Sequence, residues 1–281
     1  MDLVREENLV LCNAPLVGGA IEISGEQLKT IVDASAGAGF SGVSLWAFHH
    51  LAVVGAGGNS ETIRSWHLDR GLSTPIVESL IGWETGDLAA IEEQCGPTFE
   101  VASYYGAKTV AGVVMNSEID FDAAITGLAK LAEMAGERGL GVCIEWLPWS
   151  GLPDLKSAWK LVQDASAENI GLVVDSWHWL RQPGGPDEAT LRSIPGERIH
   201  CVQLNDTTLE ASGEDMMMES MTDRRLPGEG DVDWAALLSI LEEIGADPIW
   251  APEVFSVSLL KEGPVEMARR IHASTRKVLG L

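Results

Sequence analysis

Residues 140–175, LGVCIEWLPWSGLPDLKSAWKLVQDASAENIGLVVD, contain a complete strand–helix–strand unit. Strands are expected at 140–146 (LGVCIEW) and 170–175 (IGLVVD), because both are short apolar runs rich in β-branched side chains. Between them, apolar residues recur at helical spacing over 153–165. Units of this kind place consecutive strands parallel in one sheet. The stretch therefore predicts an α/β fold.

The same unit repeats along the chain. Apolar strands bounded by Gly, Pro or Asp are expected at 8–13, 42–47, 75–81, 108–114, 140–146, 170–175, 199–204 and 249–254. Helices are expected at 24–38, 58–70, 86–105, 119–138, 153–165, 186–193, 232–244 and 264–279. Eight βα units in 281 residues fit a closed (β/α)8 TIM barrel better than an open doubly wound sheet. Because no linker or shift in composition divides the chain, residues 1–281 are predicted to form a single domain.

Composition narrows the class of function. Apolar residues make up 46% of the chain, which allows a large core and excludes a disordered protein. The net charge of −23 predicts that nucleic acid is not a partner. No run approaches the ~20 apolar residues of a membrane span, and the acidic N-terminus does not resemble a signal peptide. Four cysteines without CxxC pairs fit a reducing compartment, so we expect a soluble, cytoplasmic protein that acts on a small molecule.

The longest stretch without strand character is 205–231, NDTTLEASGEDMMMESMTDRRLPGEGD. It is too long for an ordinary connection, and it follows a strand on the face where barrels carry their chemistry. It is therefore predicted to form a lid or a substrate-shaping loop. Four methionines in it predict either a short helix packed over the mouth or a contact within a homo-oligomer: Met216, Met217, Met218 and Met221.

Single polar side chains interrupt four consecutive strands near their carboxyl ends: Glu145, Asp175, Gln203 and Glu253. Because side chains alternate along a strand, each shares a face with a small or medium residue two positions earlier. That face is expected to fill the barrel interior: Cys143, Val173, Cys201 and Ala251. The opposite face is expected to meet the helices: Ile144, Val174, Val202 and Val254. The four polar side chains should then converge at the top of the barrel interior.

Carboxylates buried together repel one another unless a positive charge lies among them. A divalent cation is the simplest such charge. Oxygen ligands favour Mn²⁺ or Mg²⁺, and Co²⁺ is also compatible. The sequence thus predicts a metal site held by Glu145, Asp175, Gln203 and Glu253. The alternative is that each acid caps a strand end or pairs with an arginine.

Five segments carry a resemblance to a known family: IEWLPW, VVDSWHW, RIHCVQLND, RRLPGEGDVDW and WAPEVFS. In this order and spacing they resemble the second half of the xylose-isomerase-like barrel superfamily of sugar isomerases and epimerases, which also includes inosose dehydratases and endonuclease IV-type proteins. The resemblance implies that a Glu, an Asp, a His and a second Glu hold a divalent metal. Gln203 stands where the family has its histidine. His200 cannot replace it, because it lies three positions earlier, on the opposite face of the strand.

The resemblance also implies roles in catalysis. Glu145 and Glu253 match the two metal-bound glutamates that exchange a proton with the substrate through an enediolate, while the metal polarises neighbouring oxygens. His178, in DSWH, matches the histidine that contacts substrate, and Arg225, before LPGEG, matches an arginine that contacts substrate oxygens.

Aromatic residues near the strand ends suggest further substrate contacts. Tryptophans are numerous there, and Trp177 is predicted to stack on the substrate. Of the adjacent His49 and His50, at most one should reach the pocket, and His50 is the predicted one. If several indoles line the mouth, a glycoside or an aromatic hydroxyketone fits the pocket better than a free sugar.

Four hypotheses for function follow. The first is a metal-dependent isomerase or epimerase that acts next to the carbonyl of a sugar or polyol-like substrate. The second is a dehydratase or lyase that uses the same proton abstraction and then expels a β-substituent from a keto-sugar, glycoside or related hydroxyketone. The third is an endonuclease IV-like enzyme, which would need a histidine-rich zinc site and a basic face for DNA. The chain has six histidines and a net charge of −23, which disfavour it. The fourth is a catalytically silent barrel that binds a ligand.

Overall fold

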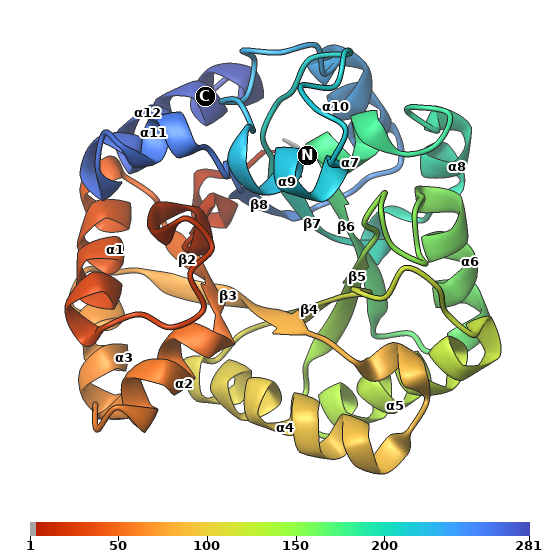
Figure 1. Cartoon of the computed structure of the whole chain (residues 1–281), viewed down its shortest axis with the longest axis horizontal. Helices are drawn as coiled ribbons and strands as arrows, with labels where there is room; N and C mark the ends of the chain where they lie inside the picture. The colour runs from red at the N-terminus through yellow and green to blue at the C-terminus, as the bar shows by residue number, and fades with distance from the viewer. Residues whose placement is uncertain (1–3) are drawn as a thin grey trace.

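A computed structural model describes residues 4–281 as a (β/α)8 barrel, which confirms the predicted fold class (Figure 1). Neighbouring strands are parallel, and they follow one another around the sheet in chain order. A bridge between Leu9 and Trp250 links the first and last strands. The strands are β1 Val10–Cys12, β2 Gly42–Trp46, β3 Ser73–Leu80, β4 Thr109–Val113, β5 Gly141–Glu145, β6 Ile170–Asp175, β7 Ile199–Leu204 and β8 Ile249–Pro252.

Helices surround the sheet, and each of the eight predicted helical ranges contains one. These are α1 Gly25–Ala38, α3 Ser60–Leu68, α4 Leu88–Tyr105, α5 Phe121–Gly136, α6 Leu155–Ala165, α8 Glu188–Ser193, α10 Trp234–Glu243 and α12 Pro264–Leu279. The long segment after β7 forms the short helix suggested by its methionines, α9 Met216–Thr222. Three further α-helices of residues 4–281 were not predicted: α2 Ala47–Gly55, α7 Ser176–Arg181 and α11 Val257–Leu260.

The core has two layers, and the predicted alternation of strand side chains is confirmed. Inward-facing residues form one cluster inside the barrel: Val10, Ile76, Ala111, Cys143, Val173, Cys201, Ile249 and Ala251. Ile144, Val174, Val202 and Val254 belong to the larger cluster between the sheet and the helices. Polar residues that end a strand on the inward side therefore lie at the top of the barrel interior.

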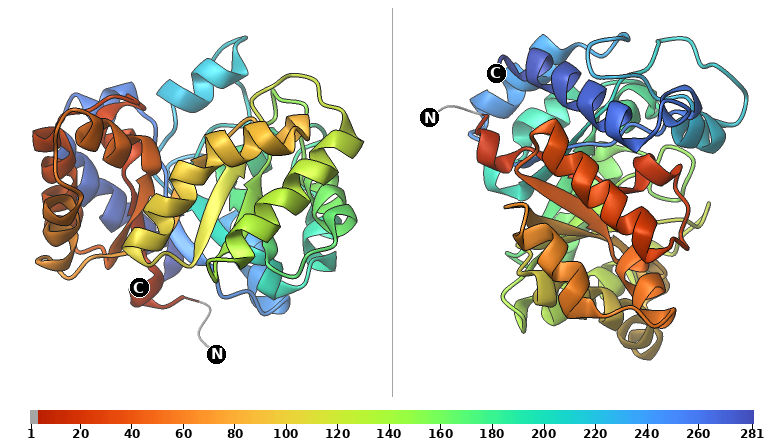
Figure 2. Two further views of the ribbon diagram at one scale, coloured as in Figure 1. Left: turned by 90° about the horizontal axis from the view of Figure 1, so that it is seen from below. Right: turned by 90° about the vertical axis from the view of Figure 1, so that its left-hand side faces the viewer.

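The segment after β7 lies across this end of the barrel. Its ends are held by bridges between Asp206 and Arg225 and between Asp223 and Ser256. Figure 2 shows α9 projecting from one face of the molecule, while the C-terminus lies toward the opposite face. Within residues 4–281, every helix is too short or too polar to cross a lipid bilayer.

Candidate active site

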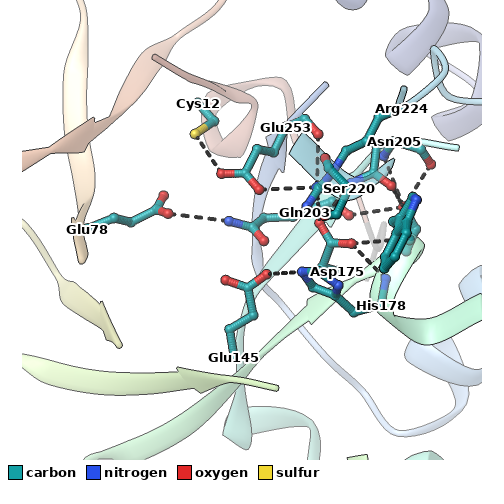
Figure 3. A network of polar contacts seen from close by, with 12 residues as sticks. Cys12, Glu78, Glu145, Asp175, His178, Gln203, Asn205, Ser220, Arg224 and Glu253 are labelled. Atoms are coloured by element: carbon teal, nitrogen blue, oxygen red, sulfur yellow. Dashed lines mark hydrogen bonds and ion pairs between the residues drawn. The ribbon is translucent and has the colours of Figure 1, made fainter. Parts of the chain in front are cut away.

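Five polar side chains from four strands and the loop after β8 meet at the top of the barrel (Figure 3). Four are the predicted residues Glu145, Asp175, Gln203 and Glu253, and the fifth is Glu78 of β3. Each is at most 5% exposed. The strand register explains part of their proximity, because Asp175 and Gln203 are direct partners across β6 and β7. In Figure 3 the Gln203 amide lies between the carboxylates of Glu145 and Glu253.

A buried arginine enters this cluster from the segment that follows α9. The Arg224 guanidinium lies 2.7 Å from Asp175 Oδ2 and 3.1 Å from Glu253 Oε2. It is 3% exposed, and it also donates to the main-chain oxygen of Glu253. The alternative that an arginine pairs with these acids therefore holds for Asp175 and Glu253. An Arg–carboxylate pair at this depth is stable only when both partners are present.

Asp175 joins the cluster to the start of α7. Its Oδ1 accepts hydrogen bonds from the main-chain N–H groups of Trp177 and His178, so it caps that helix. Its Oδ2 accepts from Arg224 and from Asn205 Nδ2. Burial raises the pKa of this carboxyl, but the nearby Arg224 charge and these hydrogen bonds outweigh burial and keep the pKa below its ordinary value. Asp175 is therefore ionised near neutral pH.

Glu145 forms a close pair with a histidine of α7. His178 Nε2 lies 3.1 Å from Glu145 Oε1, and both side chains are buried. Burial, with the neighbouring charge of Asp175, raises the pKa of Glu145 to about 8. Burial lowers the pKa of His178 to about 4, so its imidazole is neutral near pH 7. Near pH 7 the carboxyl and the imidazole are therefore both mainly uncharged.

Glu253 and Glu78 lie close to each other and to Cys12. Glu253 Oε1 accepts a hydrogen bond of 3.2 Å from the Cys12 thiol, and burial raises its pKa to about 7 despite the Arg224 charge. Glu78 accepts from the Ser44 hydroxyl and, at 3.4 Å, from Gln203 Nε2. Burial and the neighbouring charge of Glu253 raise the pKa of Glu78 well above its ordinary value. The cluster therefore holds more carboxyl groups than its positive charge can keep ionised.

Two observations test whether these residues fit a divalent cation. Gln203 Oε1 is buried and finds no hydrogen-bond partner among residues 4–281, although a metal ion would satisfy it. Ligand atoms also lie within 4.8 Å of one another in two neighbouring groups: Cys12, Glu78 and Glu253, and Glu145, Asp175 and His178. Carboxylate and amide oxygens are ligands for a hard cation. The donor set and the excess of acidic groups thus fit a divalent ion.

The other predicted contacts lie elsewhere. Arg225 is exposed, and its guanidinium points to the main-chain oxygen of Glu229, because adjacent residues of an extended segment face opposite ways. His50 is buried on α2 between Tyr105 and Ser60, with contacts of 3.0 and 3.1 Å. The structure thus brings Arg224, and not Arg225, to the carboxylates, and it places His50 between helices.

Trp177 is enclosed beside His178. It is wholly buried, and its ring centroid lies 5.4 Å from that of His178 and 5.9 Å from that of Trp149. Trp149 in turn lies 5.3 Å from the His178 ring. In the structure, Trp177 therefore supports the histidine instead of facing the mouth, and Trp149 is the partly exposed indole of this group.

Three residues of the cluster were missed in the sequence. Glu78, in PIVESLI, carries the same signal as the four predicted residues, a lone acid in an apolar strand. Arg224 precedes the predicted residue Arg225, and no local sequence pattern distinguishes the two arginines. Cys12 ends an apolar strand and looks like an ordinary core residue.

A barrel with polar residues clustered at the carboxyl ends of its strands is the arrangement typical of TIM-barrel enzymes. The chain belongs to the xylose isomerase-like TIM barrel family, since the model of that family matches residues 32–277. The resemblance noted in the sequence is thereby confirmed.

Relatives within this family have different activities. The chain is 26% identical over 243 residues to the 3-dehydroshikimate dehydratase of Pseudomonas putida. The matched residues make up 84% of this chain but only 37% of that protein. It is 30% identical over 132 residues to the inosose isomerase of Bacillus subtilis, covering 46% of this chain and 45% of that protein. The chain thus spans less than half the length of either relative.

A solved structure supports the fold independently. The IOLI protein with a bound zinc atom superposes with a TM-score of 0.82 and 19% identity, over 97% of this chain and 98% of that chain. At this identity the likeness concerns the fold. The zinc atom is a feature of that relative.

Proposed function

We propose that this chain is a metal-dependent dehydratase that removes water from a small cyclic hydroxyketone. The observation that carries the proposal is the unequal surroundings of the two central glutamates. Glu145 pairs with the neutral His178, whereas Glu253 is held by Arg224 and Cys12. Elimination needs one group to remove a proton and a different group to assist the leaving hydroxyl. The similarity to a 3-dehydroshikimate dehydratase also supports a dehydratase.

The residues that would hold the cation are Glu145, Asp175, Gln203 and Glu253. When bound, the ion would supply Lewis-acid polarisation of the substrate carbonyl and would lower the pKa of the proton next to it. Its charge would also keep Glu145 ionised, because it offsets the burial that raises the pKa of this carboxyl. Mn²⁺ and Mg²⁺ suit the oxygen ligands best, and Co²⁺ is compatible.

Glu145 would remove the proton next to the carbonyl. Its partner His178, neutral and 3.1 Å away, would hold this carboxyl in place. The electron pair of the broken C–H bond forms the new C=C bond, and the β-hydroxyl leaves. Glu253, whose pKa is about 7, would donate the proton with which the hydroxyl departs as water. Arg224 would orient substrate oxygens beside it.

An isomerase or epimerase remains the second candidate, and one specific observation favours it. The pKa values of Glu145 and Glu253, about 8 and about 7, are close enough for either carboxyl to accept or donate a proton near neutral pH. Such an exchange would replace a proton without loss of water. The inosose isomerase relative agrees with this candidate.

One experiment distinguishes the two candidates. The protein, loaded with Mn²⁺, is incubated in deuterated water with 3-dehydroshikimate, an inosose and a ketose, and the products are followed by proton NMR. A dehydratase gives a product with a new C=C bond and one fewer hydroxyl. An isomerase gives deuterium exchange at carbon with all hydroxyls retained.

Matched variants assign the activity to this site. We expect Glu145→Gln and Glu253→Gln to lower turnover by about 100-fold or more with the fold retained, because each removes a proton-transfer group of unchanged size. Glu243→Gln, an exposed acid of α10, should behave as the wild type. Wild-type turnover in either site variant would refute the proposed roles. Substrate binding without any reaction would favour the catalytically silent barrel.

A further inference from the structure

Arg181, the last residue of α7, makes an unusually dense set of contacts with the segment after β7. Its guanidinium donates to the main-chain oxygens of Thr208, Leu209 and Glu210 at 2.6, 3.2 and 3.2 Å. It also reaches the Thr207 hydroxyl at 3.1 Å. Because one planar group holds four consecutive residues, this part of the loop is fixed to α7.

The same guanidinium is paired with the acid of α9. Arg181 Nε and Nη2 lie 3.1 and 2.5 Å from Glu219 Oε1, and both side chains are almost wholly buried. The other carboxylate oxygen of Glu219 accepts from the main-chain N–H of Ser212. Arg181 and Glu219 therefore fasten both the start of the loop and the helix that follows it, and a buried pair of this kind is costly to break.

Glu219 leads directly to the arginine of the site. The next residue, Ser220, accepts from Arg224 through its hydroxyl and its main-chain oxygen, each at 2.8 Å. The main-chain N–H of Arg224 donates to the oxygen of Phe255, also at 2.8 Å. A continuous series of contacts thus runs from Arg181 through Glu219 and Ser220 to Arg224, which lies between the carboxylates.

The geometry points to Arg181 as a positioning residue, which holds the 207–219 segment and α9 in the place that inserts Arg224 between Asp175 and Glu253. The inference rests on the proposed function for its catalytic consequence, but not for its structural one. Because His178 and Arg181 stand one turn apart on α7, this short helix would place the partner of Glu145 and the support of Arg224 at the same time.

The test compares Arg181→Lys with Arg192→Lys. Lysine keeps the charge but has a single ammonium group, which cannot hold Glu219 and the three main-chain oxygens together. Arg192 forms ion pairs on the outer surface with Glu188 and Glu243, so its replacement controls for the loss of a guanidinium. The first readout is amide hydrogen exchange in residues 205–225 of the substrate-free protein.

We expect exchange at the Arg224 amide and across α9 to rise about 10-fold or more in Arg181→Lys, with the rest of the barrel unchanged. Arg192→Lys should match the wild type. This measurement needs no turnover, so it decides the structural inference even if the proposed reaction proves wrong. If exchange in 205–225 is unchanged, or if it rises equally throughout the barrel, the positioning role is refuted.

The second readout is a double-mutant cycle on kcat/KM. Arg181→Lys should lower kcat/KM about 10-fold in the wild-type background and have no further effect in Arg224→Met, because the first residue acts through the second. An equal loss of kcat/KM in both backgrounds would show that Arg181 does not act through Arg224. Glu219→Gln provides a second variant if Arg181→Lys does not fold, and it should show the same local increase in exchange and the same dependence on Arg224.

Discussion

Gln203 is the residue on which the metal site depends most. A glutamine can offer either its oxygen or its nitrogen to a ligand, and its neighbours decide which. Here Nε2 points to Glu78 Oε2, so Oε1 faces the remaining space with no protein partner in residues 4–281. An acceptor in that position suits a cation. In the proposed metal site, Gln203 would thus supply an oxygen, a harder ligand than the imidazole nitrogen that the resemblance implies at this position.

The Glu145 carboxyl should make the metal-free protein sensitive to pH. Its pKa is raised from 4.5 to about 8 by burial and by Asp175, so the folded state binds more protons than the unfolded state between these values. Its contribution to stability is therefore complete below pH 4.5 and is lost as pH rises through 8. Relative to wild type, metal-free Glu145→Gln should become progressively more stable from pH 5 to pH 8.

Urea unfolding at several pH values measures this difference. Adding Mn²⁺ should reverse the order at pH 8, because the ion stabilises only the carboxylate of the wild type. Glu243→Gln on the surface serves as the control and should show no trend with pH. A constant difference between Glu145→Gln and wild type would mean that the pKa of Glu145 is not raised in the folded protein.

Among single residues, the sequence predicted the acidic residues of the site better than its arginine. Lone acids in apolar strands are unusual enough to mark Glu145, Asp175 and Glu253, and the same rule applied to β3 would have found Glu78. The pair Arg224–Arg225 has no such signal. The direction of each side chain is set by the bridges from Asp206 to Arg225 and from Asp223 to Ser256, which are tertiary contacts.

Among the elements, α5 shows how closely one helix is fitted to the barrel. Gly127 lies where a Cβ would overlap the main-chain oxygen of Trp83, in the short helix η3 Trp83–Thr85. Trp83 is wholly buried, and its indole N–H donates to the oxygen of Val113 at the end of β4. The close approach of the two helices therefore requires glycine at this position.

We predict that Gly127→Ala lowers the free energy of unfolding by about 2 kcal/mol or more, because the helix or the Trp83 turn must move. Gly136→Ala, in the same helix, meets nothing closer than the Asn169 side chain at 3.7 Å. It should leave stability unchanged or raise it by up to about 1 kcal/mol. Urea denaturation of both variants checks the pair, and equal stability of the two would contradict the packing described for α5 and η3.

Short helices were the elements that the sequence did not predict. Helix α7 has six residues, too few for an apolar period, and it begins because the Asp175 carboxylate caps its first N–H groups. Helix α2 begins immediately after β2, in a segment expected to be a loop. The long helices were predicted well, since their apolar faces repeat over several turns.

The whole barrel was predictable because alternating strands and helices leave few arrangements for a parallel sheet. Closure was predicted from the number of βα units alone. The contacts that produce it were not, since β1 and β8 lie at opposite ends of the sequence and the Leu9–Trp250 bridge joins them. The same closure carries Cys12 to within 3.2 Å of Glu253. Contacts of this kind follow from the complete fold alone.

The proposed metal site should affect the stability of the whole molecule. A cation that binds only the folded chain raises its stability, by about 2.7 kcal/mol when the free ion exceeds its dissociation constant 100-fold. We therefore expect Mn²⁺ to raise the melting temperature of chelator-treated protein by several degrees. Gln203→Leu should lose this shift, whereas Gln203→His, which restores a metal ligand, should keep it.

Calorimetric titration of Mn²⁺ into the metal-free protein at pH 7, in buffers of different ionisation enthalpy, tests the site most directly. We predict one ion per chain with release of roughly one proton, because Glu145, with a pKa of about 8, must ionise as the ion binds. Both the binding of the ion and the release of the proton should disappear in Gln203→Leu. No binding to the wild type, or binding of equal affinity to Gln203→Leu, would contradict a metal site formed by Glu145, Asp175, Gln203 and Glu253.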